Sequence, residues 1–152
     1  MAEFAYNPIQ LVEPGQNVLL NTVIPCNKGY VFHRESAGIV ILRGIVNCPQ
    51  ACFARYQVTF NGNIALVEGA DVGPISVALA IDGEPIQTSR AIITPAAVDE
   101  YGNVTCTCIV TIPRGCCFSM AVRYVSSVND ETVTPTPVIN VSNSNLVISR
   151  VA

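Results

Sequence analysis

The longest alternation of apolar and polar side chains in the sequence runs from Cys52 to Ile64. One set of alternate positions holds Cys52, Ala54, Tyr56, Val58, Phe60 and Ile64, and the other holds Phe53, Arg55, Gln57, Thr59, Asn61 and Asn63. Successive side chains of a strand point to opposite faces, so this pattern predicts a β-strand with one face on the core and a more polar outer face. We expect this strand to lie at the centre of the fold.

The other apolar segments are short, and turn residues such as Pro14-Gly15, Asp82-Gly83 and Pro113-Arg114-Gly115 separate them. No segment requires a helix. The expected strands cover 17–24, 30–34, 39–46, 75–81, 86–94, 103–112, 118–125 and 138–151. About eight to ten short strands with frequent turns predict an antiparallel sandwich or barrel. A jelly roll of two sheets fits this count better than an immunoglobulin domain, because the chain has no Trp.

The composition adds a prediction about assembly. The chain of 152 residues fits one domain, which we place at 17–152 after a lead-in segment at 1–16. Hydrophobic residues make up 50%, but charged residues only 12%, against a usual share of about 25%. Interface centres are poor in charge and lysine while arginine is retained, and Lys28 is the single lysine here. Self-association is therefore expected, the alternative being a monomer with a neutral surface rich in Ser, Thr and Asn.

Charge and hydropathy also restrict the partners. The net charge of −3 and the absence of a run of Lys and Arg argue against nucleic acid. No apolar run approaches the roughly 18 residues that span a bilayer, so no membrane partner is expected. The N-terminal residues lack the basic and apolar regions of a signal peptide. We expect synthesis in the cytosol, with display on a spore or cell surface after release.

The order of four motifs along the chain resembles a known superfamily. The motifs are Tyr56-x-Val58-x-Phe60, the strand and turn from Ile75 to Gly83, the turn at 113–115 and the final strand from Asn145 to Val151. In this order they look like the globular heads of the tumour-necrosis-factor and complement-type superfamily. The closest likeness is to the C-terminal heads of collagen-like filament proteins on bacterial spores, over roughly residues 16 to 152.

This resemblance implies an all-β, ten-strand antiparallel jelly-roll sandwich that assembles as a homotrimer. It implies a structural or display role without enzymatic activity and without a cofactor, and leaves open whether trimers build larger assemblies. Two features depart from the family. No Gly-X-Y repeat precedes the head, and the acidic turn of the family is Gly115-Cys116 here, followed by Cys117.

Seven cysteines could form disulfides, bind metal or fill the core. None has the Cys-x-x-Cys spacing of zinc knuckles. Cys106 and Cys108 share one face of a strand at about 6.6 to 6.8 Å between Cα atoms, too far for a comfortable disulfide, and we expect them, with Cys52, to be buried thiols. The candidates for disulfides between subunits are Cys48, Cys116 and Cys117.

The expected subunit contacts are aromatic or terminal residues at sheet edges or on the less buried face. They are Tyr30, Phe32, Phe53, Arg55, Tyr124 and Val151, although the phase of its strand points Tyr124 inward. We expect the lead-in segment to dock onto a neighbouring assembly.

Two other classes of function remain open in the sequence. One is a head of a fibre or phage-like particle that binds a carbohydrate or host protein, for which the hint is Tyr101 beside Asp99 and Glu100. The other is an enzyme built on His33 and a cysteine, although no nucleophile motif surrounds any cysteine or serine. The paired acids of the loops lack the alternating spacing of calcium sites, so we expect them to be solvated.

Overall fold

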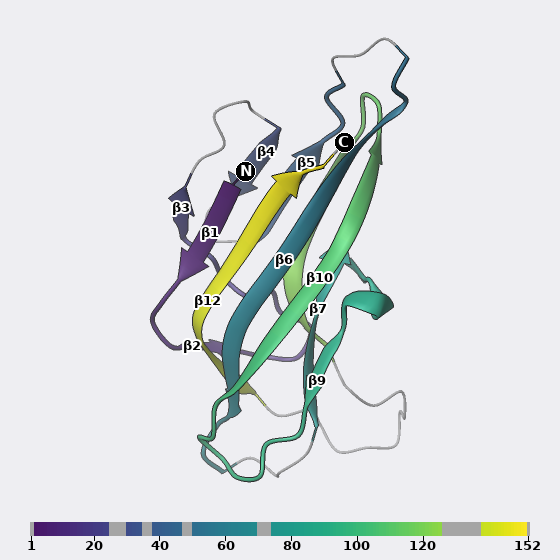
Figure 1. Ribbon diagram of the computed structural model, residues 1–152. Helices are drawn as coiled ribbons and strands as arrows, with labels where there is room; N and C mark the ends of the chain where they lie inside the picture. The colour runs from purple at the N-terminus through teal and green to yellow at the C-terminus, as the bar shows by residue number, and fades with distance from the viewer. Residues whose placement is uncertain are drawn as a thin grey trace.

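Two antiparallel sheets of six strands each pack face to face in the computed structural model of the chain (Figure 1). The structure describes residues 2–24, 30–34, 38–46, 50–69, 74–125 and 138–151. The first sheet has the order β10-β6-β12-β1-β3, and β2 also pairs with β12. Its strands are β1 (Ala2–Tyr6), β2 (Gln10–Val12), β3 (Thr22–Ile24), β6 (Phe53–Leu66), β10 (Gly102–Pro113) and β12 (Ile139–Arg150).

The second sheet has the order β4-β5-β11-β7-β8, and β9 also pairs with β7. Its strands are β4 (Val31–Arg34), β5 (Ile39–Arg43), β7 (Ile75–Ile81), β8 (Glu84–Pro85), β9 (Ala91–Ile93) and β11 (Cys117–Val125). A 3-10 turn, η1 (Gln87–Ser89), lies between β8 and β9. The prediction of an all-β jelly-roll sandwich is confirmed, and the described residues also form short strands that were not predicted, such as β1 and β2.

Strand β6 occupies the predicted central position, between β10 and β12. From Ala54 to Ile64 its alternate residues are buried, and Tyr56, Val58 and Phe60 are at most 1% exposed. The inner faces of its neighbours β10 and β12 extend this side of the core cluster, and β7 and β11 of the second sheet supply the other side. The period of two in the sequence therefore reports the sandwich interior correctly.

The lead-in segment differs from the prediction. Residues 2–6 form β1, which pairs with β12 from Ala2↔Ile148 to Tyr6↔Ser144. Phe4 is 2% exposed and belongs to the core. The segment was misread because its apolar positions are few and Pro8 interrupts them. Residues 2–6 and 10–12 are therefore an integral part of the first sheet, and the docking of this segment onto a neighbouring assembly stays a prediction.

The segment 17–24, predicted as one strand, is split. Its first half lies along β11 of the second sheet, where Val18 N donates to the Val122 carbonyl at 2.8 Å and Asn17 bridges to Arg123. Its last three residues form β3 beside β1 in the first sheet. The chain thus crosses between the sheets here, and an alternating pattern cannot reveal such a crossing because apolar residues alternate through both halves of the segment.

The Asp82-Gly83 turn is confirmed as a tight hairpin between β7 and β8. Both residues have positive φ, 50° at Asp82 and 86° at Gly83, as the favoured two-residue hairpin turn requires. The Asp82 carboxylate accepts hydrogen bonds from the Ser119 N–H at 3.0 Å and from its hydroxyl at 2.9 Å. This carboxylate therefore has a structural role and ties the hairpin to β11.

A hydrogen bond joins the two sheets where β6 begins. The Tyr56 hydroxyl donates to the backbone carbonyl of Arg43 at 2.6 Å. Arg43 is the last residue of β5, and its N–H donates to the Tyr30 carbonyl at 2.9 Å. These bonds fix β5 and the start of β4 against the first sheet at the end of the sandwich that carries most of the candidate residues.

Candidate functional site

The outer face of the β10-β6-β12-β1 sheet is a broad surface of uncharged polar side chains. Among the described residues, only Glu3 and Arg55 are charged on this face. The others are Ala5, Phe53, Gln57, Thr59, Asn61, Asn63, Ala65, Asn103, Thr105, Thr107, Ile109, Thr111, Pro113, Asn140, Ser142, Asn145, Val147 and Ser149. Two sequence patterns, on β6 and β10, predicted this polarity.

Hydrogen bonds between β6 and β10 order this face. Asn103 donates to the side-chain oxygens of Asn61 at 2.8 Å and Asn63 at 3.2 Å. Thr105 donates to Asn61 at 3.3 Å, and the hydroxyls of Thr59 and Thr107 lie 3.2 Å apart. Cross-strand pairs of this kind stabilise the sheet and hold the side chains in fixed positions. The face is therefore a preorganised array of donors and acceptors.

The residues predicted as subunit contacts fall into two groups. Phe32, Phe53 and Val151 are 58%, 38% and 50% exposed, respectively. The Arg55 guanidinium lies 4.4 Å from the centre of the Phe53 ring, and the Arg55 carbonyl accepts from the Val151 N–H at 2.9 Å. The structure thus brings three of the predicted residues together where β6 begins.

Two of the predicted contacts are less accessible. Tyr30 is half-buried, and the guanidinium of Arg150 stacks on its ring at 4.4 Å from the centre. Tyr124 was predicted wrongly, because its side chain lies in the core with no exposed area. Burial raises the pKa of Tyr124 to about 12. The inward phase of its strand was the correct signal.

The cysteines separate into buried and exposed sets. Cys106 is 1% exposed, and its thiol donates to the Val77 carbonyl at 3.5 Å. Burial raises the pKa of Cys106 to about 11 and also raises the pKa of the half-buried Cys108. Cys116 and Cys117 are exposed, as predicted. Cys48 lies outside the described residues.

The prediction that Cys52 is buried was wrong. Its side chain is exposed, because β6 begins one residue later, at Phe53, and the alternation no longer governs position 52. The Cys52 carbonyl accepts from the Arg114 N–H at 2.9 Å, beside the turn that leads to Cys116. Three exposed thiols therefore lie at one end of the sandwich.

The cysteine, histidine and acidic side chains bear on the metal-site and enzyme alternatives. No group of three or more His, Cys, Asp or Glu side chains in the described part of the chain is arranged to hold a metal ion, and its five cysteines are free thiols. The His33 side chain is outside the described set. In the same part of the chain, no helix is long and apolar enough to cross a membrane.

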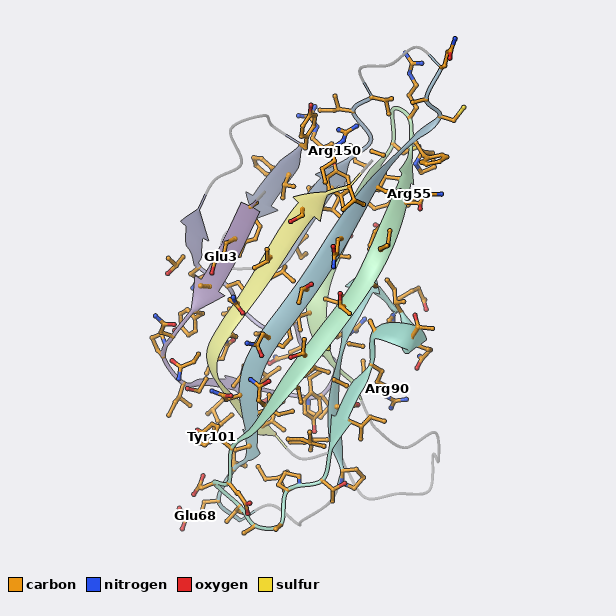
Figure 2. The ribbon with its side chains drawn as sticks, viewed as in Figure 1. Glu3, Arg55, Glu68, Arg90, Tyr101 and Arg150 are labelled. Atoms are coloured by element: carbon orange, nitrogen blue, oxygen red, sulfur yellow. The ribbon has the colours of Figure 1, made fainter. Side chains whose placement is uncertain are left out.

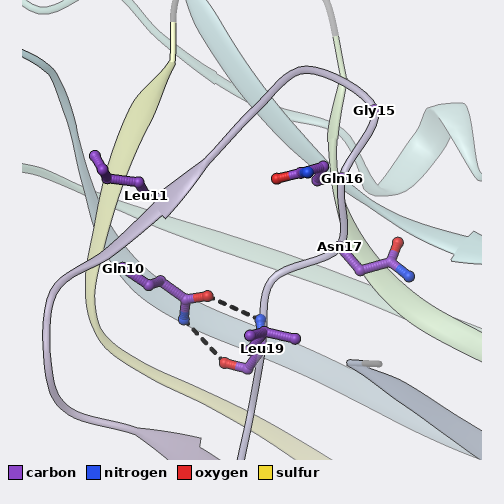
Figure 3. A pocket seen from close by; sticks show the side chains of 6 residues that line it. All are labelled: Gln10, Leu11, Gly15, Gln16, Asn17 and Leu19. Atoms are coloured by element: carbon purple, nitrogen blue, oxygen red, sulfur yellow. Dashed lines mark hydrogen bonds between the residues drawn. The ribbon is translucent and has the colours of Figure 1, made fainter. Parts of the chain in front are cut away.

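A pocket of about 380 Å³ lies where the chain crosses between the sheets (Figure 3). The Gln10 side chain is paired with the backbone of Leu19, accepting from its N–H and donating to its carbonyl, each at 2.9 Å. The Gln16 side-chain oxygen accepts from the Glu13 N–H at 3.1 Å. These amides hold the crossing segment in place, so the pocket is explained by the fold.

Known structures share this architecture. The globular domain of zebrafish complement 1qA protein superposes with a TM-score of 0.59 at 11% identity, over 95% of this chain and 92% of that one. Eiger TNF from S. frugiperda superposes with a TM-score of 0.63 at 11% identity, over 100% and 92%. The chain therefore has the fold of tumour-necrosis-factor and complement-type globular heads, as the order of its motifs implied.

The remaining comparisons do not indicate a function for this chain. The C-terminal domain of the sugar-binding protein EclA reaches a TM-score of 0.42 at 17% identity, over 95% of this chain and 79% of that one, which is too low to bear on this chain. No protein-family model matches the sequence, and no curated protein does.

Proposed function

We propose that this chain is a non-enzymatic structural head that assembles as a homotrimer through the outer face of the β10-β6-β12-β1 sheet. The observation that carries the proposal is the near absence of charge on that face, where the described residues include only Glu3 and Arg55 as charged groups. Charged groups are costly to remove from water, whereas amides and hydroxyls that already bond to one another lose little.

The edges of this face add apolar contact area. Ile109 is 64% exposed in the middle of β10, the outermost strand of the sheet. Phe53 and Val151 are exposed where β6 begins and β12 ends. Such side chains supply the anchors of an interface, while the polar array fixes its register. The homotrimer itself is the assembly implied by the sequence resemblance, and display on a spore or cell surface is part of the same proposal.

A single lysine on the face tests the interface. Thr59 lies at its centre, between Thr107 of β10 and Val147 of β12. In Thr59→Lys the added charge would be buried on association, so we expect the trimer to dissociate. The matched control is Thr88→Lys, which adds the same charge to the exposed turn η1.

Light scattering coupled to gel filtration gives the masses, in reductant and at 300 mM NaCl. We expect the wild type and Thr88→Lys at three times the 16.2 kDa of the chain, and Thr59→Lys at the mass of a single chain. A wild type that stays at 16.2 kDa at high concentration, or a Thr59→Lys variant that remains trimeric, would contradict the proposal.

A further inference from the structure

The arginines of this chain gather at one end of the sandwich, although they are scattered in the sequence. Four of the six arginines whose side chains are described lie where β6 begins and β5, β10 and β12 end. The pairs Phe53↔Pro113, Arg43↔Cys117 and Tyr56↔Arg150 place these elements at the same level. We call Arg43, Arg55, Arg114 and Arg150 the arginine end.

The described segments around the arginine end, 43–46, 50–55, 113–117 and 150–151, contain no Asp or Glu. Arg43, Arg55 and Arg114 are exposed. Stacking of Arg55 on Phe53 and of Arg150 on Tyr30 holds two of the guanidinium groups in defined positions. The other two described arginines, Arg90 and Arg123, lie away from this end and bond to Ser76 and to backbone carbonyls.

The opposite end of the sandwich carries the opposite charge. Glu68, Asp99 and Glu100 are exposed in the described segments 67–69 and 94–101, which contain no Lys or Arg. Asp99 N–H donates to the Leu66 carbonyl at 2.9 Å, which fixes this loop at the end of β6. We call Glu68, Asp99 and Glu100 the acidic end.

The two ends are too far apart to neutralise each other within one copy. Figure 2 shows Arg55 and Arg150 toward one end and Glu68 toward the other. The 14 residues of β6 separate them, which is roughly 40 Å at about 3.3 Å per residue. This exceeds the Debye length of about 8 Å at physiological salt, so each end presents its own field to neighbouring molecules.

We propose that copies of this chain associate end to end, with the arginine end of one copy against the acidic end of the next. A second copy fits because it supplies both complementary surfaces, whereas a free polyanion would match the arginine end alone. Like ends repel, so the contact is head to tail, and such a contact extends into open chains. The inference rests on the proposed self-assembling role but uses different surfaces from the sheet face.

Two charge-reversal variants test the proposal. Arg55→Glu with Arg114→Glu cancels the net charge of the arginine end, because two glutamates then face the remaining Arg43 and Arg150. Glu68→Arg with Glu100→Arg gives the acidic end a net positive charge, because two arginines then face Asp99. Sedimentation velocity at 20 and 300 mM NaCl, in reductant, measures the mass. For the wild type we expect growth with concentration at 20 mM NaCl, weakened at least about tenfold at 300 mM because exposed charges are screened.

Each reversal variant alone should stay at its 300 mM mass in 20 mM NaCl. An equal mixture of the two should grow in mass, because the acidic end of the first variant still fits the arginine end of the second. Wild-type mass that is independent of salt, or a mixture that does not grow, overturns the proposal. If a reversal variant fails to fold, Arg55→Gln with Arg114→Gln replaces it, and undiminished growth of that variant is the overturning result.

A binding experiment with heparin distinguishes a second copy of the chain from a polyanion as the partner of the arginine end. One outcome would assign the arginine end to a polyanion and refute the proposal. In that outcome the wild type binds heparin at 150 mM NaCl but does not grow in mass at low salt, and Arg55→Glu with Arg114→Glu loses the binding of heparin. The sheet-face trimer is read at 300 mM NaCl, where end contacts are screened. Its failure is therefore distinguishable from failure of the end-to-end contact.

Discussion

The hydrogen bond between the Tyr56 hydroxyl and the Arg43 carbonyl offers a direct test of how the sandwich is held together beside the arginine end. Tyr56→Phe removes the hydroxyl and keeps the ring, which is 1% exposed in the core. The bond is 2.6 Å long and crosses from the first sheet to the second. The change therefore removes one tie between the layers without creating a cavity in the packed interior.

The expected cost follows from this geometry. A hydrogen bond contributes about 0.5–1.5 kcal/mol net, and a buried acceptor that loses its donor costs about 1–3 kcal/mol. The carbonyl of Arg43 lies at the end of the sandwich, where water can partly replace the hydroxyl, so we expect a loss of about 1–2 kcal/mol. For a chain of this size, that lowers the Tm by about 2–8 °C.

Urea and thermal unfolding followed by far-UV circular dichroism measure the loss, at one protein concentration because assembly contributes to stability. The control is Tyr101→Phe, whose ring is 41% exposed and whose loss should stay within about 0.5 kcal/mol. If Tyr56→Phe costs no more than Tyr101→Phe, the bond does not join the sheets in solution.

Three further outcomes are expected. In native protein, maleimide should label the exposed thiols but not Cys106 until the chain unfolds; peptide mass mapping shows this, and rapid labelling of Cys106 would contradict its burial. Stability should fall from pH 9 upward, because the Cys106 thiol has its ordinary pKa of 9.0 in the unfolded chain, whereas burial raises the pKa of the folded thiol to about 11. The loss, about 1–2 kcal/mol after allowance for solvent screening, should become smaller between pH 9 and 10 in Cys106→Ala, where only the raised pKa of Cys108 remains to contribute. Gly62→Ala should cost about 1–3 kcal/mol, since its Cβ would lie 3.0 Å from Phe60 Cζ; unchanged unfolding in urea would refute that contact.

The long strands were predicted well from the sequence because apolar and polar side chains alternate along most of their length. Strand β7 has the predicted bounds, and β10, β11 and β12 differ by one or two residues. The predictions failed where the end of a strand or a crossing between the sheets, and not the alternation, determines the position of a side chain. Cys52 follows the alternation but precedes the strand, and the chain between Asn17 and Ile24 changes sheets. No local pattern reports either event.

The candidate surfaces show the same division. The polar face was visible in the alternating Thr and Asn residues of β6 and β10, because strand period and polarity are local properties. The arginine end was not visible, because Arg43, Arg55, Arg114 and Arg150 come from four elements that only the sheet topology brings to one level. A sequence without a run of basic residues can therefore still fold into a molecule with a basic end.

The positions of the exposed thiols and of the charges restrict each other. Cys52, Cys116 and Cys117 lie beside the arginine end, and the described segments of the acidic end contain no cysteine. A disulfide formed by these three thiols between successive copies would bring two arginine ends face to face, whereas copies that lie side by side in parallel hold these thiols at the same level. Oxidation, in which two thiols pass two electrons and two protons to an oxidant such as dioxygen, should therefore link copies within one lateral oligomer.

The lateral oligomer and the end-to-end contact should therefore respond differently to salt and to reductant. After exposure to air, non-reducing electrophoresis should show linked species no larger than the lateral oligomer, and their amounts should not depend on salt during oxidation. End-to-end growth at 20 mM NaCl should persist in Cys116→Ser with Cys117→Ser, because charge rather than sulfur drives it. A disulfide ladder that extends beyond the lateral oligomer would show that like ends meet, and head-to-tail order would then be excluded.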